Sequence, residues 1–407
     1  MNILFLSELF YPHGGGAELA TYLYARLANR SGHNVTVITN RFAGESETYH
    51  QDNLSIHRIP LFGERGVTKY SLWHRLDVLF SSRFRAFLKS ADIVYIPRFW
   101  YSTIPLAKSL GKKVVVHLHD YIPICPLTTI HNQTSDTICN CKRYLCTPKC
   151  IYIFEKTSKR KLLQILESMI LNLSLGRCQG RIIGLSDAVI CVSQAHRNLV
   201  IRNAPYLEQK IRVINNPLPQ NSHLYTPGDD FGYFGGPSRL KGFFVLWRAI
   251  KSINNDYHKI VNVHATKLDT ATKSLVKSSR ISRIYACGKL GNEELHRVHE
   301  KIRAVIVPSI WPEPSPYVVA EALIRGKLVI ASDIGGIPEL LTGSHGCFLF
   351  PSDNHQELAK DILHVAALSK EQVMDLGAKN RESTLRRFSN DKIASEFTQL
   401  LSAVAHD

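Results

Sequence analysis

Short runs of apolar residues alternate with amphipathic helical patterns along the whole chain. Asn2–Leu6 is an apolar run of the kind that forms a strand buried on both faces. A glycine-rich segment follows, and residues 17–29 then place leucines at four-residue spacing, which indicates a helix with one apolar face. Ser31-Gly32 ends that pattern, and residues 35–39 form the next apolar run. The strand, helix and strand together predict a βαβ unit.

The alternation continues in two series separated by a linker. The first series predicts strands at 92–96, 113–118, 188–192 and 211–214 and a helix at 104–110. The second predicts strands at 231–234, 260–264, around Tyr285, 304–307 and 328–331, and helices at 243–253, 317–324 and 390–404. Residues 215–230 are rich in Pro, Asn, Gly and Ser with little periodicity, so they are the predicted linker. The pattern predicts an α/β chain of two doubly wound Rossmann-like domains facing across a cleft.

Composition and charge narrow the class of protein. The chain has 407 residues, 44% of them hydrophobic, which excludes a disordered chain or a disulfide scaffold. Its net charge is +16, of which residues 1–225 carry +13 and residues 226–407 carry +3. A basic N-terminal half indicates an anionic partner, either a phospholipid surface, a phosphorylated substrate or nucleic acid, with plain solubility charge as the alternative. No uninterrupted apolar run is long enough to span a bilayer and the N-terminus lacks a basic leader, so we expect a cytoplasmic protein.

Two further segments of the N-terminal half leave their interpretation open. Five of the nine cysteines fall between Cys125 and Cys150, where a structural metal, a disulfide and reduced thiols compete as explanations. Residues 156–175 begin with four basic side chains and then turn apolar, which predicts one amphipathic helix. That helix either packs inside its domain or lies on an anionic membrane.

The segment from Val307 to Leu341 carries the sharpest chemical pattern. A buried strand ends at Pro308, Glu313 follows on a loop, and Ser315 is the predicted N-cap of a helix with Pro316 at its first position. Glu321 then lies on the same helix, eight residues after Glu313. A helix N-terminus attracts phosphate, whereas carboxylates accept hydrogen bonds from paired hydroxyls. Unless the two glutamates are merely solvated, this combination predicts a sugar nucleotide as the ligand.

Three other segments end predicted strands with residues suited to the same ligand. Residues 233–242 combine a glycine turn with Arg239 and Lys241, which together make a cradle for a diphosphate. His119 follows the strand 113–118, at the end where functional residues collect. The alternative is a structural histidine whose hydrogen bonds are satisfied within the protein. Gly15 and Gly16 lie in a loop that does not fit G-x-G-x-x-G, and no acidic residue ends the second strand, so NAD binding is disfavoured.

Taken together, these segments resemble family 4 of the retaining glycosyltransferases with the GT-B fold. The resemblance includes the E-x7-E signature and the small-residue loop that follows it. The matched residues are Glu313, Glu321, Ala322, Gly326, Gly335, Gly336 and Glu339. Lys241-Gly242 match the end of the family's G-R-L-x-x-x-K-G motif, but Gly236 stands at its arginine position and Arg239 lies three residues later.

The resemblance assigns roles to these residues. Glu313 would hold hydroxyls of the donor sugar, Glu321 would hold the ribose, and Lys241 and Arg239 would contact the diphosphate. His119 would lie near the donor sugar, and Gly15 and Gly16 would close on the donor phosphates and the acceptor. Ser315, Pro316 and Tyr317 would line the substrate site. No cofactor and no catalytic metal is implied.

The domain organisation that the resemblance implies is an acceptor domain, 1–220, a nucleotide-sugar domain, 221–388, and a helix, 389–407, that crosses back to the first domain. The implied reaction moves a sugar from a UDP- or GDP-sugar to a hydroxyl on a glycan or lipid-linked acceptor, as in the synthesis of cell-surface polysaccharide or glycolipid, with an anionic membrane surface as a further partner. A sugar-nucleotide epimerase or hydrolase on the same fold is the alternative, and an inactive scaffold is a weaker one. Nucleic-acid binding is disfavoured because the sequence contains no recognisable reading module.

Overall fold

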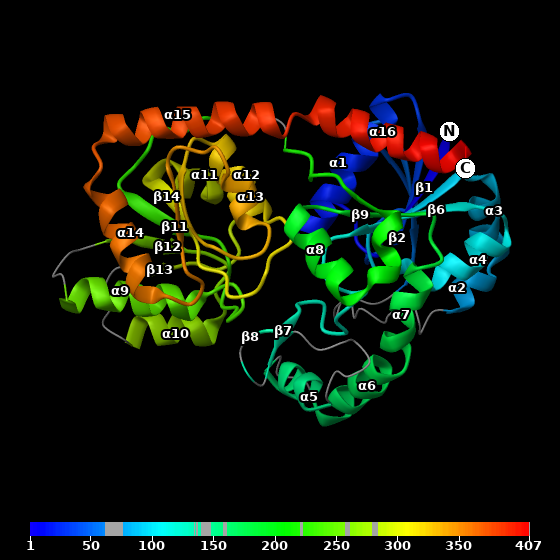
Figure 1. Cartoon of the computed structure of the whole chain (residues 1–407), viewed down its shortest axis with the longest axis horizontal. Coiled ribbons are helices and arrows are strands. Elements are labelled where there is room, and N and C mark those ends of the chain that lie inside the picture. Colours follow the sequence, from blue (N-terminus) through cyan, green and yellow to red (C-terminus); the bar gives the residue numbers. More distant parts are fainter. Residues whose placement is uncertain are drawn as a thin grey trace. The chain divides into compact units, whose positions relative to one another are not determined.

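The computed structural model describes residues 1–61, 76–133, 135, 137–139, 148–157, 161–219, 223–256, 261–278 and 284–406. The chain forms two compact units (Figure 1). Unit 1 consists of Met1–Pro217 and Asn390–Asp407, and unit 2 consists of Leu218–Ser389. No helix among the described residues is both long and apolar enough to cross a membrane.

Unit 1 is built on an eight-stranded sheet with the order β10-β9-β6-β5-β1-β2-β4-β3. Its strands are β1 (Asn2–Leu6), β2 (Asn34–Asn40), β3 (Thr48–Gln51), β4 (Leu54–Ile59), β5 (Ile93–Ile96), β6 (Lys113–Leu118), β9 (Ala188–Cys191) and β10 (Ile211–Val213). All neighbouring pairs are parallel except β3 and β4. The strand order reverses between β1 and β5, so the crevice beyond their carboxyl ends is the place where a doubly wound sheet binds ligands.

Helices surround this sheet, and the last helix of the chain joins them. The helices of unit 1 are α1 (Gly16–Arg30), α2 (Leu76–Phe80), α3 (Ser82–Ser90), α4 (Ile104–Ser109), α5 (Pro148–Thr157), α6 (Leu162–Leu173), α7 (Leu175–Ile183), α8 (Gln194–Asn203) and α16 (Asn390–His406). Phe397 of α16 is fully buried, and its ring lies 4.8 Å from that of Tyr24 on α1 and 5.5 Å from that of Tyr95 on β5. The expected return of the C-terminal helix to the N-terminal unit is therefore confirmed.

Unit 2 repeats the architecture with a six-stranded parallel sheet of order β13-β12-β11-β14-β15-β16. Its strands are β11 (Asp230–Tyr233), β12 (Val263–Ala265), β13 (Ile284–Ala286), β14 (Ile302–Val307), β15 (Leu328–Ser332) and β16 (Cys347–Phe350). Its helices are α9 (Phe243–Asp256), α10 (Thr270–Ser278), α11 (Asn292–Lys301), α12 (Tyr317–Ile324), α13 (Ile337–Leu341), α14 (His355–Ala367) and α15 (Lys370–Arg387). Here the strand order reverses between β11 and β14. The fold class is therefore the predicted one, with two Rossmann-like domains.

The structure differs from the sequence predictions in one helix and in several strands. Residues 156–175 do not form one helix, because α5 ends at Thr157 and α6 begins at Leu162. The antiparallel edge strand β3, its neighbour β4 and the last strand β16 were not predicted. Three of the four residues of β3 are exposed, so it lacks the apolar run that marks a central strand.

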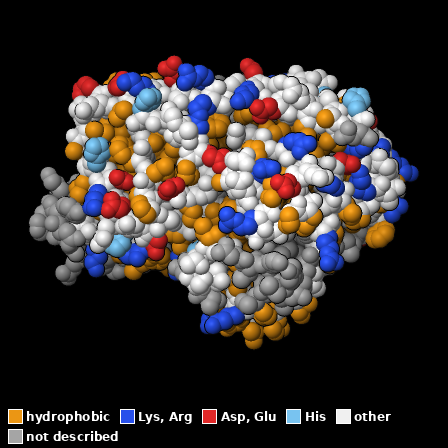
Figure 2. Space-filling view, viewed as in Figure 1, with side chains coloured by type: hydrophobic (Ala, Val, Ile, Leu, Met, Phe, Trp, Pro, Cys, Tyr) orange, Lys and Arg blue, Asp and Glu red, His pale blue; other side chains and the backbone are white. Residues whose placement is uncertain are grey.

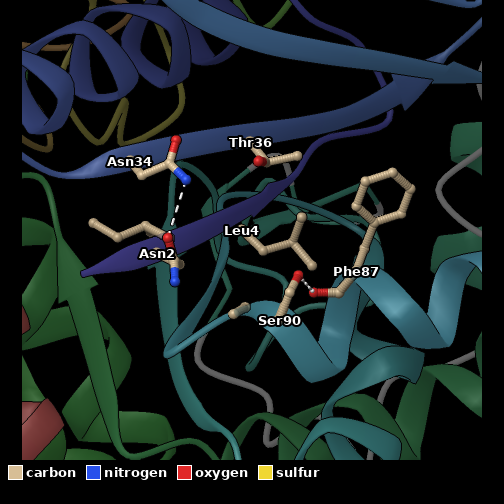
Figure 3. Close-up of a pocket in the computed structure, with 8 residues that line it drawn as sticks. Asn2, Leu4, Asn34, Thr36, Phe87 and Ser90 are labelled. Atoms are coloured by element: carbon tan, nitrogen blue, oxygen red, sulfur yellow. Dashed lines mark hydrogen bonds between the residues drawn. The ribbon is translucent and has the colours of Figure 1, made fainter.

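A pocket in unit 1 lies at the opposite end of the sheet from the crevice (Figure 3). Asn2 and Leu4 of β1, Asn34 and Thr36 of β2 and two residues of α3, Phe87 and Ser90, line it. The side-chain amide of Asn34 donates a hydrogen bond of 3.0 Å to the Asn2 side chain across its wall. Because these residues begin their strands, the pocket is not at the edge where parallel sheets hold ligands.

Candidate functional site

The loops that follow β11 and β14 in unit 2 are held together directly. Ile310 after β14 donates its backbone N–H to the carbonyl of Leu240 after β11, at 2.9 Å. The buried Tyr233 hydroxyl donates to the carbonyl oxygens of Gly236, at 2.9 Å, and Lys241, at 3.3 Å. The glycine turn and the glutamate loop, whose residues Lys241 and Glu313 are 72 positions apart in the sequence, therefore form one surface at the switch point of the sheet.

Lys241 and Glu313 form an ion pair on this surface. The Lys241 ammonium lies 2.5 Å from Glu313 Oε2, and its Nζ lies 5.3 Å from the centre of the Trp311 ring. The Ser309 hydroxyl donates to the other carboxylate oxygen of Glu313. The Glu313 side chain is 4% exposed and that of Lys241 is 37% exposed, so the carboxylate is fixed while the ammonium reaches solvent. The pair presents one cation and one hydrogen-bond acceptor to a ligand.

Glycines allow these loops to approach each other. Gly242 has φ +78°, and a Cβ there would lie 1.6 Å from the carbonyl oxygen of Pro308. Gly335 has φ +61°, and a Cβ there would lie 2.5 Å from the carbonyl oxygen of Glu313. Gly336 donates its N–H to that same carbonyl at 2.7 Å. The Gly-Gly pair after β15 therefore supports the backbone of Glu313.

The close approach at Gly242 predicts a large effect of adding a single methyl group. Gly242→Ala should lower the free energy of unfolding by about 2 to 3 kcal/mol, because the added Cβ overlaps the Pro308 carbonyl and the φ is left-handed. Gly32→Ala is the matched control, since Gly32 has φ +85° but no atom within 4 Å of a Cβ. The control should cost only about 1 kcal/mol. Equal losses in chemical denaturation would contradict the proposed contact between the two loops.

Three predicted residues of unit 2, Ser315, Pro316 and Tyr317, lie at the start of α12. The predicted cap is wrong: Pro316, with φ −75° and ψ 119°, is the N-cap, so Ser315 lies one residue outside the helix. The sequence placed Pro316 at the first helical position, but its backbone is extended, so the helix begins one residue later than predicted. Tyr317 begins the helix, and burial followed by the charge of Glu321 raises the pKa of its hydroxyl well above the usual value.

The other two predicted residues of unit 2, Glu321 and Arg239, are not members of the Lys241–Glu313 ion pair. Glu321 of α12 accepts a hydrogen bond of 3.1 Å from Arg325, the C-cap residue of that helix. Arg239 is exposed on the loop after β11. The structure therefore joins Lys241 with Glu313, while Glu321 has its own cation.

The switch point of unit 1 holds a cluster of charged residues that the sequence analysis did not identify. Arg98, directly after β5, donates to the Glu18 carboxylate on α1 and has its Nε 3.6 Å from the Glu8 carboxylate after β1. Glu8 is 1% exposed and Glu18 is 3% exposed. A charged residue directly after a buried strand, as with Arg98 and Glu8, was the available signal, because the carboxyl ends of neighbouring parallel strands meet at one edge.

This cluster fixes the glycine loop between β1 and α1. Glu18 accepts a hydrogen bond of 2.7 Å from the Gly15 N–H, so that amide is already used inside the chain. Gly14 has φ +97°, and a Cβ there would lie 2.4 Å from the Glu18 side chain. Gly15 has a negative φ, and both Gly15 and Gly16 are exposed. The residue that must be glycine for packing is therefore Gly14.

His119 follows β6 and adds an uncharged polar group to unit 1. Its ring stacks on that of His117 with centroids 4.3 Å apart. Burial, and then the positive charge of Arg98, lower the pKa of His119 to about 3. Its buried Nε2 has no hydrogen-bond partner in the part of the chain that the structure describes. A neutral imidazole with one unused nitrogen suits a hydroxyl, as either donor or acceptor.

The buried Glu8 predicts a pH-dependent stability. Burial raises the pKa of Glu8 from 4.5 to about 7, although Arg98 opposes the shift. A raised pKa in the folded state contributes stability at low pH that is lost as the pH rises through 7. In Glu8→Gln this loss is absent, so the unfolding free energy of the variant relative to wild type should rise by roughly 3 kcal/mol from about pH 5 to about pH 8. Urea titrations across this pH range measure the difference in unfolding free energy, with Glu357→Gln at a half-exposed position as the control. A difference between Glu8→Gln and wild type that does not change with pH would contradict the prediction.

The cysteine segment is only partly described. Cys125, Cys139 and Cys150 are buried, whereas Cys141 and Cys146 lie outside the described residues. The choice between metal, disulfide and thiols therefore stays a hypothesis.

Comparison with known proteins covers both units. Residues 14–221 match the family described as Glycosyltransferase Family 4, and residues 228–367 match the one described as Glycosyl transferases group 1. An uncharacterized 42.6 kDa protein in the cps region of Klebsiella pneumoniae is 23% identical over 361 residues, which cover 84% of this chain and 87% of that protein. An uncharacterized glycosyltransferase of Methanocaldococcus jannaschii is 28% identical over 209 residues, 51% of this chain and 57% of that protein.

Solved structures share the fold over nearly the whole chain. Sucrose-phosphate synthase from Thermosynechococcus elongatus has a TM-score of 0.71 at 16% identity, with 99% of this chain and 98% of that chain covered. Anabaena HepE in complex with UDP and glucose has a TM-score of 0.65 at 18% identity, with 98% and 99% covered. At these identities the likeness concerns the fold, which is GT-B.

Proposed function

The chain belongs to glycosyltransferase family 4, and we propose that it transfers a sugar from a nucleoside-diphosphate sugar to a hydroxyl acceptor with retention of anomeric configuration. The observation that carries the proposal is the Lys241–Glu313 pair at the β11–β14 switch point. A diphosphate needs a cation and a sugar needs a hydrogen-bond acceptor, and the pair supplies both within 2.5 Å.

In the proposed complex the donor takes the place of the ion pair. The diphosphate approaches Lys241, Arg239 and the N-terminus of α9, which begins directly after Gly242. Glu313 then accepts hydrogen bonds from sugar hydroxyls, and Glu321 accepts them from the ribose. Cations beside a helix N-terminus oppose its dipole, so an anion between them stabilises both.

The proposed chemistry is a front-face transfer, in which the only bonds that break and form are those of the donor and the acceptor. The bond between the anomeric carbon and the diphosphate oxygen breaks as the acceptor oxygen bonds to the same face of that carbon. The acceptor proton passes to the departing diphosphate oxygen. Lys241 and Arg239 accelerate the step by stabilising the charge on this leaving group.

The donor and the acceptor are proposed on different grounds. UDP is the first nucleotide to test, because a solved structure of Anabaena HepE contains UDP. The candidate donors are UDP-glucose, which another HepE structure contains, and GDP-sugars. The acceptor is assigned to unit 1 and is proposed to be anionic, as in a phosphate-bearing lipid-linked glycan, since residues 1–225 carry +13. His119 contributes its unused Nε2 to a substrate hydroxyl.

The ribose role of Glu321 has a direct test. Glu321→Gln should weaken binding of the free nucleoside diphosphate by about tenfold, because a hydrogen bond to a charged group is lost. Calorimetric titration measures this, with Glu382→Gln on the neighbouring helix α15 as the control for charge. Unchanged affinity would remove Glu321 from the nucleotide site. Donor turnover that needs no acceptor would favour the epimerase or hydrolase alternative.

A further inference from the structure

Helix α6 exposes a row of large apolar side chains and buries Ser168 and Asn172 beside Ile165, unlike an ordinary surface helix. Leu162, Leu163, Leu166 and Ile170 are 66%, 79%, 47% and 67% exposed. At a spacing of i, i+1, i+4 and i+8 they lie along one side of the helix, and we call them the leucine stripe. An ordinary helix of a globular protein turns this side toward the core.

A buried polar contact holds the opposite side of α6 to α5, and a second pair of hydrogen bonds within α6 supports it. Ser168 is buried and donates its hydroxyl to the buried Glu155 carboxylate of α5. The buried Asn172 side chain donates to the Ser168 carbonyl at 2.7 Å and to its hydroxyl at 3.0 Å. This network fixes which side of α6 faces inward, so the leucine stripe is held outward by the fold.

Exposed lysines lie on α5 and at the residue that precedes α6. Lys149 and Lys156 of α5 and Lys161 at the start of α6 are exposed. Between residues 142 and 167 the sequence has seven Lys and Arg against two Glu, and one of those, Glu155, is buried. Figure 2 shows the hydrophobic side chains at the lower edge, where Figure 1 places α5 and α6, with a basic side chain next to them.

We propose that α6 is the membrane-docking element of this protein, with the leucine stripe inserted among the lipid chains of an anionic bilayer surface. An apolar face flanked by lysines is the pattern of a helix that lies in the plane of the interface. The lysines then lie at the level of the headgroups, where anionic lipids attract them. Tyr152, 39% exposed on α5 and approached by the Lys156 ammonium at 5.7 Å, is a side chain suited to that boundary. The inference does not depend on the donor site in unit 2.

Vesicle co-sedimentation without any sugar nucleotide tests the proposal. Wild type should bind vesicles that contain phosphatidylglycerol more tightly than vesicles of phosphatidylcholine alone, and salt should weaken that preference. Leu163→Gln/Ile170→Gln should lower the vesicle partition coefficient by about tenfold or more. Leu185→Gln/Leu385→Gln, which changes two exposed leucines outside α6, is the matched control and should bind as wild type.

Three results would overturn the proposal, provided that the variants keep the melting temperature of wild type. They are absence of vesicle binding by wild type, equal binding by the α6 variant, and a wild-type dimer in solution that the α6 variant makes monomeric. The last would mean that a second copy of the chain covers the leucine stripe. None of these results involves donor binding, so they leave the proposed function untouched.

Discussion

Replacing Lys241 with methionine should lower kcat/KM for sugar transfer by about 10²–10³-fold, because the leaving diphosphate loses its cation. Methionine keeps most of the volume that packs near Trp311. The rate is measured as nucleoside diphosphate released from the donor that wild type consumes. Lys251→Met, which removes an exposed lysine from helix α9, is the matched control and should leave the rate unchanged.

Lys241→Met also leaves Glu313 without its cation. A double variant separates this effect from the loss of charge beside the leaving group. If Lys241 acts only by holding Glu313, Lys241→Met/Glu313→Gln should be no slower than Glu313→Gln alone. If Lys241 stabilises the leaving group, the double variant should be slower than either single variant. A rate for Lys241→Met close to that of wild type would contradict the role in transfer.

Glu313→Gln should lower kcat by about 10²-fold or more while changing nucleotide affinity much less. The amide keeps the shape of the side chain, but its NH₂ group cannot accept the hydrogen bonds that sugar hydroxyls and the Lys241 ammonium donate. Glu357→Gln breaks an exposed ion pair of 2.7 Å with Lys360 and is the matched control. The control should cost at most about 0.5 kcal/mol of stability and no activity.

The split between rate and affinity is the informative part of this experiment. Nucleotide affinity that falls in parallel with the rate would move Glu313 from the sugar to the nucleotide. A collapse of the melting temperature would instead mean that Glu313 mainly joins the loops after β11, β14 and β15.

The central strands were predictable because their residues are apolar on both faces. Asn2–Leu6 and Lys113–Leu118 have the predicted bounds, and the other predicted strands differ by a few residues at their ends. Strand β3 was not predictable from the same signal, since Thr48–Gln51 is mostly exposed and depends on antiparallel pairing with β4. Local pattern therefore identified the buried central strands and missed β4 as well as the edge strands β3 and β16.

Motifs in the sequence supplied the candidate site residues of unit 2, but the contacts between these residues were not predictable from the sequence. Lys241 and Glu313 are 72 residues apart, and their pairing follows from the position of β11 next to β14. The cluster of Glu8, Glu18 and Arg98 in unit 1 spans 90 residues for the same reason. For helix α6 the apolar side was visible in the sequence, but its direction was not. The exposure of the leucine stripe and the buried Ser168–Glu155 contact show that this side faces outward.

Calorimetric titration of wild type and Lys241→Met with UDP, GDP and ADP measures whether the β11–β14 switch point of unit 2 binds a nucleoside diphosphate through Lys241. We expect wild type to bind one of these nucleotides and the variant to bind it at least about tenfold more weakly. If wild type binds none of them, or if the two proteins bind with equal affinity, Lys241 does not form such a site.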